Sequence, residues 1–334
     1  MSEQEYTPEV EVPPVPPSPE QQSFFPNDPN YGKGDKPVIG VVGHGFVGKA
    51  VERSFNPEVE RFLVDPNYGT TIDQLIEQEP ALCFVCTPTP VGGTGRIDAA
   101  VTSDAVLKLI RLTKAGVVLK STVTPDIIDK ITRSIGDQAH RFVYAPEFLT
   151  EKNADEEFCN PKFMVFGGVP ASVSALIEFF HYSTYVKLPK NTEDDGGIHV
   201  CHPVEASFVK YAINCFLAMK VTFMNQLMDA CADESWTTNP LMVAKILSAE
   251  PRIGGTHWRA PGPDGKKGFG GACFPKDLSA LINYSDKFSL LEHVQEVNNK
   301  YRAEYDRDER EEAQNITFGK KEVLTESEEK GDEE

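Results

Sequence analysis

A short apolar run, a glycine-rich turn and a helix-forming segment follow one another directly, and this order restricts the fold more than any other feature of the chain. Val38–Val42 is a β-strand candidate, Gly43-His-Gly-Phe-Val-Gly48 has the GxGxxG spacing, and Lys49–Ser54 favours a helix. In this context the first glycine permits a tight turn, the second admits a pyrophosphate and the third lets the helix pack on the strand. A pyrophosphate would lie at the helix N-terminus, where free N–H groups favour anions. The segment predicts a dinucleotide site that includes Gly43, Gly45, Phe46, Val47 and Gly48.

Asp65 follows a second strand candidate, Arg61–Val64, and lies 22 residues after Gly43. This spacing is close to that of a carboxylate that binds the adenosine ribose hydroxyls and repels a 2′-phosphate, so NAD is the expected cofactor. Gly43 to Lys49 also fits the GxxxxGK pattern of a phosphate-binding loop. That motif needs Ser or Thr next, and the next residue is Ala50, so a nucleotide triphosphatase is disfavoured.

Strand and helix patterns then alternate, which predicts an α/β fold with a Rossmann-type doubly wound parallel sheet over residues 37–190. The further strands are expected at Leu82–Val85, Gly116–Leu119, Arg141–Tyr144, Phe163–Phe166 and Thr184–Lys187. Ligands of such sheets gather outside the carboxyl ends of the strands. Thr89, Thr122 and Glu147 follow three of these ends, so we expect them to line the site. Pro, Ser and Thr in these segments also favour ordinary turns.

A long helix is expected from Val204 to about Asp233, because this stretch contains no proline or glycine. Apolar residues occupy nearly all of its faces, so it must be buried, and packing against a second copy of the chain would bury it. We therefore predict a helical dimerisation and catalytic domain over residues 200–300. Lys210 and Asn214 are neighbours on one face of this helix. A lysine among apolar residues needs an anionic or polar partner, unless its head reaches solvent.

Cys273 lies between a glycine-rich approach and the pair Lys276-Asp277, in the stretch Gly268–Asp277. Glycines let the backbone come close to a ligand, and a thiolate near cationic groups is a good nucleophile for carbonyl carbons. The alternative is a flexible surface loop with a structural thiol.

The other cysteines favour neither a disulfide framework nor a metal site. The chain has seven cysteines, and without a secretory signal reduced thiols are expected. Cys83 and Cys86 form a CxxC inside a strand candidate, where residues i and i+3 point to opposite faces, so we interpret them as core thiols. His199, Cys201 and His202 lack a completing ligand. No metal is predicted.

Both ends of the chain are acidic. Residues 1–36 contain eight prolines, which predicts an extended, disordered arm, and residues 301–334 are expected to form a disordered acidic tail. The net charge is −18, with no basic footprint for nucleic acid and no apolar run long enough for a bilayer. The expectation is a cytoplasmic protein with neither nucleic-acid nor membrane partners.

Taken together, these segments resemble those of the UDP-glucose/GDP-mannose dehydrogenase family. The similarity spans roughly residues 37–300, and the matching segments occur in the family's order. They are Gly43–Gly48, Phe84–Pro90, Lys120–Val123, Ala145–Glu151, Glu205 through Lys210 to Asn214, Arg252–Gly254 and Gly268–Asp277. The family oxidises the primary alcohol of a nucleotide sugar to the acid in two NAD-dependent steps, so the resemblance implies a UDP- or GDP-sugar as substrate.

The resemblance also implies roles for individual residues. Cys273 is similar to the nucleophile that captures the aldehyde as a thiohemiacetal and then forms a thioester. The other implied catalytic residues are Lys210 and Asn214 for oxyanions, Asp277 for water, and Thr122 and Glu147 for thioester hydrolysis. Thr89, Thr122 and Lys276 are implied to contact NAD. The residues implied to contact substrate are Phe148, Leu149, Glu151, Lys210, Asn214, Gly270 and Arg252, the last one from the partner subunit of a homodimer.

The chain departs from the family pattern at several places. Lys152, Lys162 and Phe163 replace usual residues, and Pro261–Lys267 resembles an insertion. Family members continue into a third, nucleotide-binding domain, whereas few residues follow residue 300, so we expect a shortened form. Two alternatives stay open: a non-catalytic NAD-binding dimer that acts as scaffold or regulator, and a single-step hydroxyacid-type dehydrogenase, which has no use for Cys273.

Overall fold

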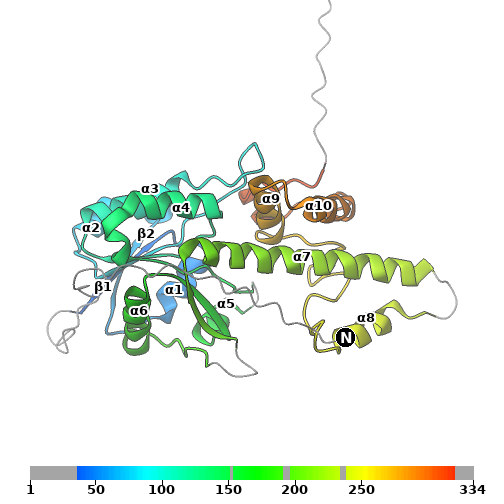
Figure 1. The fold of residues 1–334 in the computed structure, drawn as a ribbon, viewed down its shortest axis with the longest axis horizontal. Helices are drawn as coiled ribbons and strands as arrows, with labels where there is room; N and C mark the ends of the chain where they lie inside the picture. Colours follow the sequence, from blue (N-terminus) through cyan, green and yellow to red (C-terminus); the bar gives the residue numbers. More distant parts are fainter. Residues whose placement is uncertain (1–35, 151–152, 191–195, 234–237, 320–334) are drawn as a thin grey trace, which may run out of the picture.

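The structure, a computed structural model, describes residues 36–150, 153–190, 196–233 and 238–319. It consists of a layered sheet-and-helix part and a helical part, which the long helix α7 joins (Figure 1). The predicted arm of residues 1–36 lies outside the described residues except for Lys36. Glu151 and Lys152 lie outside them as well.

A seven-stranded sheet forms the first part, with the order β2-β1-β3-β4-β5-β6-β7. All neighbouring strands are parallel except β5 and β6, which are antiparallel. The strands are β1 Val38–Val42, β2 Glu60–Val64, β3 Leu82–Val85, β4 Gly116–Leu119, β5 Phe142–Tyr144, β6 Phe163–Gly168 and β7 Gly197–Cys201. This architecture confirms the predicted fold class, with one antiparallel pairing added.

Helices cover both faces of the sheet. The helices of this part are α1 Phe46–Ser54, α2 Ile72–Ile76, α3 Ala100–Leu112, α4 Pro125–Ile135, α5 Ala154–Cys159 and α6 Pro170–Ser183, with short 3-10 turns η1 Pro66–Tyr68 and η2 Gly136–Arg141. Successive residues of a central strand enter opposite cores: Cys83 and Val85 belong to one cluster, Leu82 and Phe84 to the other. Strands that are buried on both faces need continuous apolar runs, which explains why these strands could be recognised in the sequence.

Cys83 is a buried core residue of β3, and Cys86, just after this strand, is partly buried against the core. Burial raises the pKa of the Cys83 and Cys86 thiols to about 12. Both thiols are therefore protonated at neutral pH. Within the described residues, no group of three or more His, Cys, Asp or Glu side chains could hold a metal ion.

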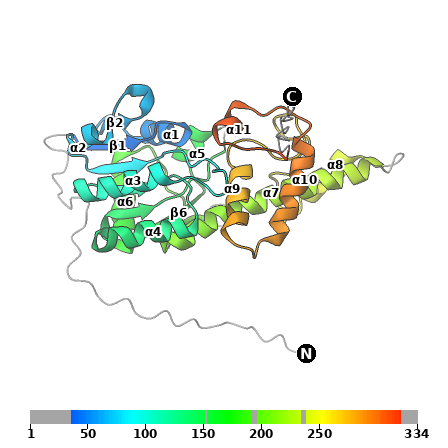
Figure 2. The same ribbon diagram turned by 90° about the horizontal axis from the view of Figure 1, so that it is seen from above.

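Helix α7, Pro203–Asp233, crosses from the sheet to the helical part, and its 31 residues span about 46 Å. It packs against β6 and α4 of the sheet part and against α8, α9 and α10 of the helical part. The helices of this part are α8 Pro240–Ser248, α9 Phe274–Tyr284, α10 Ser289–Arg302 and α11 Glu309–Ala313. In Figure 2 α9 and α10 lie across α7, so α7 supports both the sheet edge and the helices that follow the Cys273 loop.

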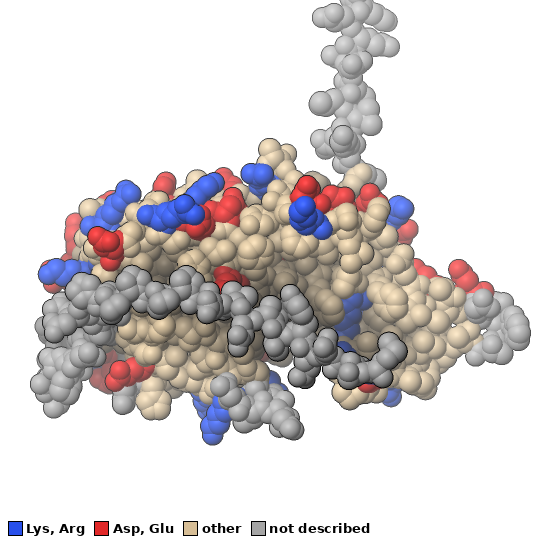
Figure 3. All heavy atoms as spheres, viewed as in Figure 1, with Lys and Arg blue, Asp and Glu red and all other residues tan. Residues whose placement is uncertain are grey.

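One side of α7 stays exposed in the single chain. Phe216 and Phe223 are 62% and 57% exposed, and Leu241 and Ile246 of α8 are also exposed. The face of the molecule over α7 and α8 carries few charged side chains, whereas charges gather along the opposite rim (Figure 3). Within the single chain one side of α7 is therefore exposed, and its burial against a second copy stays a prediction.

The last strand was predicted at the wrong place. Thr184–Lys187 is not a strand: Thr184 forms a single bridge with Phe55, and its hydroxyl donates to the Phe180 carbonyl at the end of α6, 2.6 Å away. The seventh strand is Gly197–Cys201, which begins between the two predicted domains, residues 37–190 and 200–300. Pairing with β6 along its whole length outweighs the weak strand preference of its glycine.

The acidic segment after residue 300 is folded as far as it is described. Helix α10 continues to Arg302, α11 follows, and Ile316 and Phe318 are buried. The prediction of a disordered tail from residue 301 is wrong for residues 301–319, because a few buried side chains anchor an otherwise polar segment. Residues 320–334 lie outside the described part. Among the described helices, none is both long and apolar enough to cross a bilayer.

Candidate active site

The glycine-rich turn after β1 is shaped by the backbone around it. Gly43 has φ +88°, and its N–H donates to the Val64 carbonyl at 2.8 Å. A Cβ on Gly48 would lie 2.1 Å from the Gly43 carbonyl oxygen, so α1 can approach the turn only with glycine there. A Cβ on Gly45 would meet nothing within 4 Å. The turn therefore presents open space at the start of α1, where an anion is favoured.

Of the neighbouring predicted contacts, Phe46 is 47% exposed and Val47 is half-buried. Both lie in the first turn of α1 next to the open space at Gly45. Asp65 at the end of β2 accepts hydrogen bonds from the His44 N–H at 2.8 Å and the Asn67 N–H at 3.0 Å. These two backbone donors lower the pKa of Asp65 below its ordinary value. An ionised, partly exposed carboxylate beside the glycine turn fits a ribose.

The residues that follow β3, β4 and β5 contact one another in two pairs at the carboxyl ends of these strands. The buried Thr89 hydroxyl after β3 donates to the Thr122 carbonyl after β4, at 3.0 Å. Glu147 after β5 forms an ion pair with Lys120 at 3.0 Å, and its carboxylate also accepts the Phe148 N–H at 2.8 Å. Lys120 is itself buried and was not among the predicted site residues. Its place at the end of β4 was the available signal.

Lys210 of α7 reaches the strand ends. It is buried, donates to the Glu147 carbonyl, and lies with its Nζ 5.2 Å from the centre of the Phe148 ring. The lysine has therefore not reached solvent, and a backbone carbonyl is its partner. An ammonium group has three N–H donors, so further donors remain for a ligand.

A second buried cluster lies one turn further along α7. The Asn214 side-chain amide donates to Asp277 Oδ2 at 2.5 Å, and Lys276 Nζ lies 2.5 Å from Asp277 Oδ1. All three side chains are less than a tenth exposed. Because Lys210 and Asn214 are neighbours on α7, the helix connects the two clusters. The structure thus places Lys210 against Glu147, and Asn214 against Asp277 and Lys276, while the catalytic roles of these residues stay predictions.

Cys273 is exposed at the N-cap position of α9, and its carbonyl accepts the Asp277 N–H at 2.9 Å. The N-terminal end of a helix favours a thiolate. The positive charge of Lys276 in the first turn is paired with Asp277, so the role of Cys273 as a nucleophile stays a prediction.

Two asparagines hold the backbone that leads to Cys273, and sequence reasoning missed both. Asn225 of α7 accepts the Gly268 N–H at 3.1 Å. Asn298 of α10 accepts the Phe269 N–H at 2.7 Å and donates to the Phe269 carbonyl at 3.0 Å. Both are buried polar residues on helices, which is the only hint that the sequence offered.

Three of the predicted substrate contacts lie elsewhere or face the protein itself. Arg252 is exposed and pairs with Glu250 at 2.9 Å. Leu149 packs against the sheet core, and a Cβ on Gly270 would lie 2.2 Å from the Arg302 guanidinium. Glu151 lies outside the described residues.

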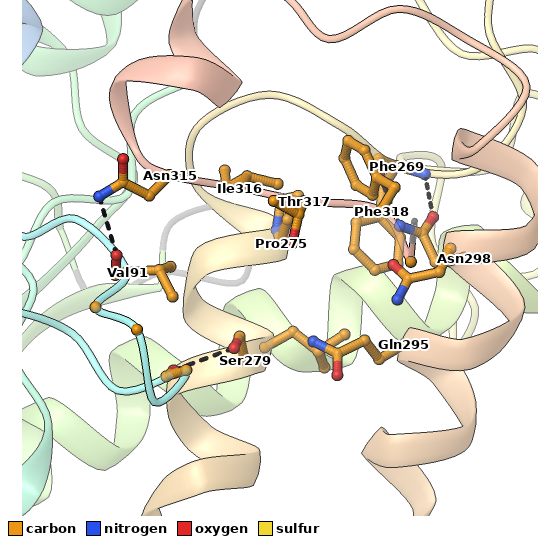
Figure 4. A pocket seen from close by; sticks show the side chains of 16 residues that line it. Val91, Phe269, Pro275, Ser279, Gln295, Asn298, Asn315, Ile316, Thr317 and Phe318 are labelled. Atoms are coloured by element: carbon orange, nitrogen blue, oxygen red, sulfur yellow. Dashed lines mark hydrogen bonds between the residues drawn. The ribbon is translucent and has the colours of Figure 1, made fainter. Parts of the chain in front are cut away.

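A cavity of about 590 Å³ adjoins the cysteine loop. Figure 4 shows Phe269 and Asn298 on one side of it and Asn315 with Val91 on the other. Its lining comes from the segment after β3, from α9 and α10, and from residues 315–319, and it includes no Asp, Glu, Lys or Arg. The lining is therefore unsuited to a diphosphate.

The sheet, the glycine turn and the acid after β2 define a dinucleotide-binding domain of the Rossmann type. Residues 49–183 match the NAD-binding domain of the UDP-glucose/GDP-mannose dehydrogenase family, and residues 204–300 match the central domain of the same family. The chain belongs to this family. The resemblance seen in the sequence and the choice of NAD as cofactor are both confirmed.

Relatives and solved structures agree with this assignment. The chain is 29% identical over 233 residues to the UDP-glucose 6-dehydrogenase TuaD of Bacillus subtilis, covering 66% of this chain and 47% of the relative. It is 32% identical over 272 residues to a Rickettsia felis UDP-glucose 6-dehydrogenase, covering 74% and 57%. The chain thus spans about half the length of these curated relatives.

Among solved structures, a UDP-glucose dehydrogenase from Pyrobaculum islandicum superposes with a TM-score of 0.60 at 25% identity, covering 80% of this chain and 69% of that one. A 3-hydroxyisobutyrate dehydrogenase from Mycobacterium tuberculosis gives 0.59 at 16% identity, covering 84% and 96%. The second likeness concerns the fold alone.

Proposed function

We propose that this chain oxidises the primary alcohol of a nucleotide sugar to the carboxylate, with NAD as the hydride acceptor and Cys273 as the nucleophile. The observation that carries the proposal is the buried pairing of Asn214, Asp277 and Lys276 in the first turns behind Cys273. Together with Lys210 on the same helix as Asn214, this cluster supplies two ammonium groups and an amide. Such groups near an exposed cysteine suit a reaction that forms oxyanions.

The first oxidation removes a hydride from the sugar C6 and a proton from its hydroxyl, which leaves an aldehyde. The Cys273 Sγ then adds to the aldehyde carbon, and the carbonyl oxygen becomes the oxyanion of a thiohemiacetal. The remaining N–H groups of Lys210 and the amide of Asn214 would stabilise that oxyanion. Loss of a second hydride leaves a thioester on Cys273.

Water then attacks the thioester carbon, and the carboxylate leaves as Cys273 regains its thiol. In this proposal Asp277 orients the water, and Thr122 and Glu147 assist from the strand ends. Lys120 is added to the predicted set as the group that holds the Glu147 carboxylate in place, through their ion pair. Thr89, Thr122 and Lys276 would contact NAD, and Gly43 to Gly48 with Asp65 would hold its adenosine half.

The substrate is proposed to be a UDP- or GDP-sugar that lies over Cys273, with Phe148, Leu149, Glu151 and Gly270 around it. We further propose that the protein is a cytoplasmic homodimer in which the exposed apolar side of α7 is covered by a second copy. Arg252, which is exposed in the single chain, would then reach the substrate of the partner subunit.

The assay is NADH formation with NAD and a panel of UDP- and GDP-sugars, with analytical ultracentrifugation of the same sample. Two NADH per sugar are expected from the wild type. Cys273→Ser should abolish turnover and leave NAD binding intact, and Cys201→Ser is the matched control because Cys201 is a half-buried strand thiol. A wild type that forms no NADH with any sugar would overturn the proposal.

One observation favours a second candidate. The lining of the cavity beside the cysteine loop includes no charged side chain that would bind a diphosphate. A non-catalytic NAD-binding dimer, a scaffold or regulator, would bind NAD in calorimetry and turn over no sugar. Full activity with a small hydroxyacid in Cys273→Ala would instead indicate a single-step dehydrogenase.

A further inference from the structure

The acidic helix α11 contacts the backbone that leads to Cys273. Glu311 is fully buried, and its Oε1 accepts the Gly271 N–H at 3.0 Å. Its Oε2 accepts the Asp308 N–H at 3.0 Å, which closes the capping box of α11. One carboxylate therefore connects the start of α11 with a backbone amide two residues before Cys273.

Arg302 at the end of α10 fixes that carboxylate. Its Nη2 lies 2.8 Å from Glu311 Oε1, and its Nη1 lies 2.7 Å from Asp264 Oδ2. The guanidinium is 1% exposed and faces the Phe318 ring at 5.4 Å. Asp264 belongs to the stretch Pro261–Lys267, which resembled an insertion in the sequence. Arg302 thus joins the stretch Pro261–Lys267 to α11.

The backbone of the cysteine loop is tightly packed at Gly270. A Cβ on Gly270 would lie 2.2 Å from Arg302 Nη2 and 2.3 Å from Glu311 Oε1. The ion pair therefore packs directly on the Gly270 backbone while it holds the Gly271 amide. The remaining guanidinium nitrogen, Arg302 Nε, is buried without a hydrogen-bond partner among the described residues. Buried pairs of this kind contribute little net stability, but they do impose a specific geometry.

We propose that Glu311, held by Arg302, is a positioning residue that sets the place of Cys273 at the start of α9. Through Gly271 the carboxylate fixes the last turn of backbone before the cysteine, and so directs the thiol toward the site of Lys210 and Asn214. This role depends on the proposed function only in that Cys273 is taken as the nucleophile. It assigns to the short segment after α10 a task inside the active site.

The test compares Glu311→Gln and Glu311→Ala with the matched control Glu312→Gln, because Glu312 lies next to it and is exposed. Hydrogen–deuterium exchange is measured on the full chain, well below its unfolding temperature. We expect exchange of a peptide spanning residues 269–274 to become about tenfold faster in Glu311→Ala, since a buried amide loses a charged acceptor. Glu311→Gln, which keeps an acceptor oxygen, should show a smaller increase, and Glu312→Gln none. A peptide from the middle of α7 should stay unchanged in all three.

Turnover gives the second readout. If the wild type oxidises a nucleotide sugar, kcat should fall about tenfold or more in Glu311→Ala, because the thiol is no longer held in its productive position. A residue with a merely structural role would lower the unfolding temperature and leave kcat unchanged at lower temperature.

The outcomes separate this proposal from the proposed function. A wild type without turnover contradicts the proposed function, while the exchange data still decide whether Glu311 anchors the loop. Unchanged exchange at residues 269–274 in Glu311→Ala overturns the positioning role, and so does an unchanged kcat in an active protein. If Glu311→Ala does not fold, Glu311→Gln decides by the same two criteria.

Discussion

The two glycine-rich loops of this molecule reach defined shapes by different means. In the turn after β1, the atoms that exclude a side chain from Gly48 belong to Gly43 of the same turn. In the loop before Cys273, the atoms that exclude one from Gly270 belong to Arg302 and Glu311, more than thirty residues further along the chain. At Gly48 the constraint comes from the turn itself, although Gly43 and His44 also bond to the end of β2, whereas at Gly270 it comes from distant side chains. Changes to Arg302 or Glu311 should therefore affect the second loop.

Gly48→Ala should cause the largest loss of stability. The added methyl group would lie 2.1 Å from a backbone oxygen, so α1 must move away from the turn, at a cost of about 3 kcal/mol or more. Urea unfolding measures the loss. Gly45→Ala is the control: it points into open space, so it should leave stability unchanged and weaken NAD binding if the pyrophosphate passes there. Equal stability of the two variants would contradict the local character of this loop.

Gly270→Ala should cost less, about 2 kcal/mol, because the obstacles are side chains that can move. Removing the obstacle should reduce the cost. In a double-mutant cycle the penalty of Gly270→Ala should therefore shrink by about 1 kcal/mol in a Glu311→Ala background. Strict additivity of the two changes in thermal unfolding would show that the loop does not depend on α11.

Asp65→Ala tests whether the turn after β1 and the acid after β2 bind NAD. Asp65 accepts the His44 N–H of the turn and is expected to bind the ribose, so its loss should weaken NAD binding by about tenfold, or about 1.4 kcal/mol. Isothermal titration calorimetry measures the Kd. Asp73→Ala, an exposed acid on α2, is the control, and a Kd unchanged by Asp65→Ala would remove Asp65 from the cofactor site.

Asp229→Asn should have the smallest effect, and it depends on pH. Asp229 lies 2.6 Å from Lys267, directly before the cysteine loop, and accepts the Tyr301 hydroxyl at 2.8 Å. Burial alone would raise the pKa of Asp229, but the hydrogen bonds of Lys267 and Tyr301 lower it below its ordinary value. The carboxylate's contribution is therefore complete above the unfolded-state pKa of about 4 and is lost as the pH falls through the lower folded pKa.

Because Asp229 and Lys267 are both more than a third exposed, solvent reduces the expected loss to about 1 kcal/mol at pH 7. Thermal unfolding of Asp229→Asn should converge on the wild type as the pH falls below about 4. Asp233→Asn, an exposed acid near the end of the same helix, should match the wild type at every pH. A gap that stays constant down to low pH would rule out the carboxylate as its cause.

The difference between the loops also explains what could be predicted from the sequence. Val38 to Asp65 contains the strand, the turn, the helix and the acid of a local unit, so its fold and its residues were recognisable together. Lys210 and Asn214 could be paired from helical spacing. Their partners, the Glu147 carbonyl and Asp277, lie 63 residues away in opposite directions, and only the family resemblance placed them in one site.

The features that the sequence did not predict share one property: each depends on a contact with a residue that is distant in the sequence. Glu311 sits in an acidic segment whose composition is typical of disorder, and nothing near it in sequence reveals Arg302 as its partner. Gly197–Cys201 begins with a glycine and follows a polar segment, and it forms a strand by pairing with β6 along its whole length. Asn225 and Asn298 are single amides on helices, and a helix pattern does not show which backbone group they will meet.

Helix α7 also restricts how this chain can vary in length. Asn214, which holds Asp277, and Asn225, which holds Gly268, lie eleven residues apart on the same rod, close to three full turns. Substitutions of residues between them leave the relative orientation of the two asparagines around the helix axis unchanged. A single inserted or deleted residue would rotate one asparagine by about 100° relative to the other and separate the two halves of the cysteine's surroundings. The helix between Asn214 and Asn225 should therefore tolerate substitutions but no insertion or deletion of a residue.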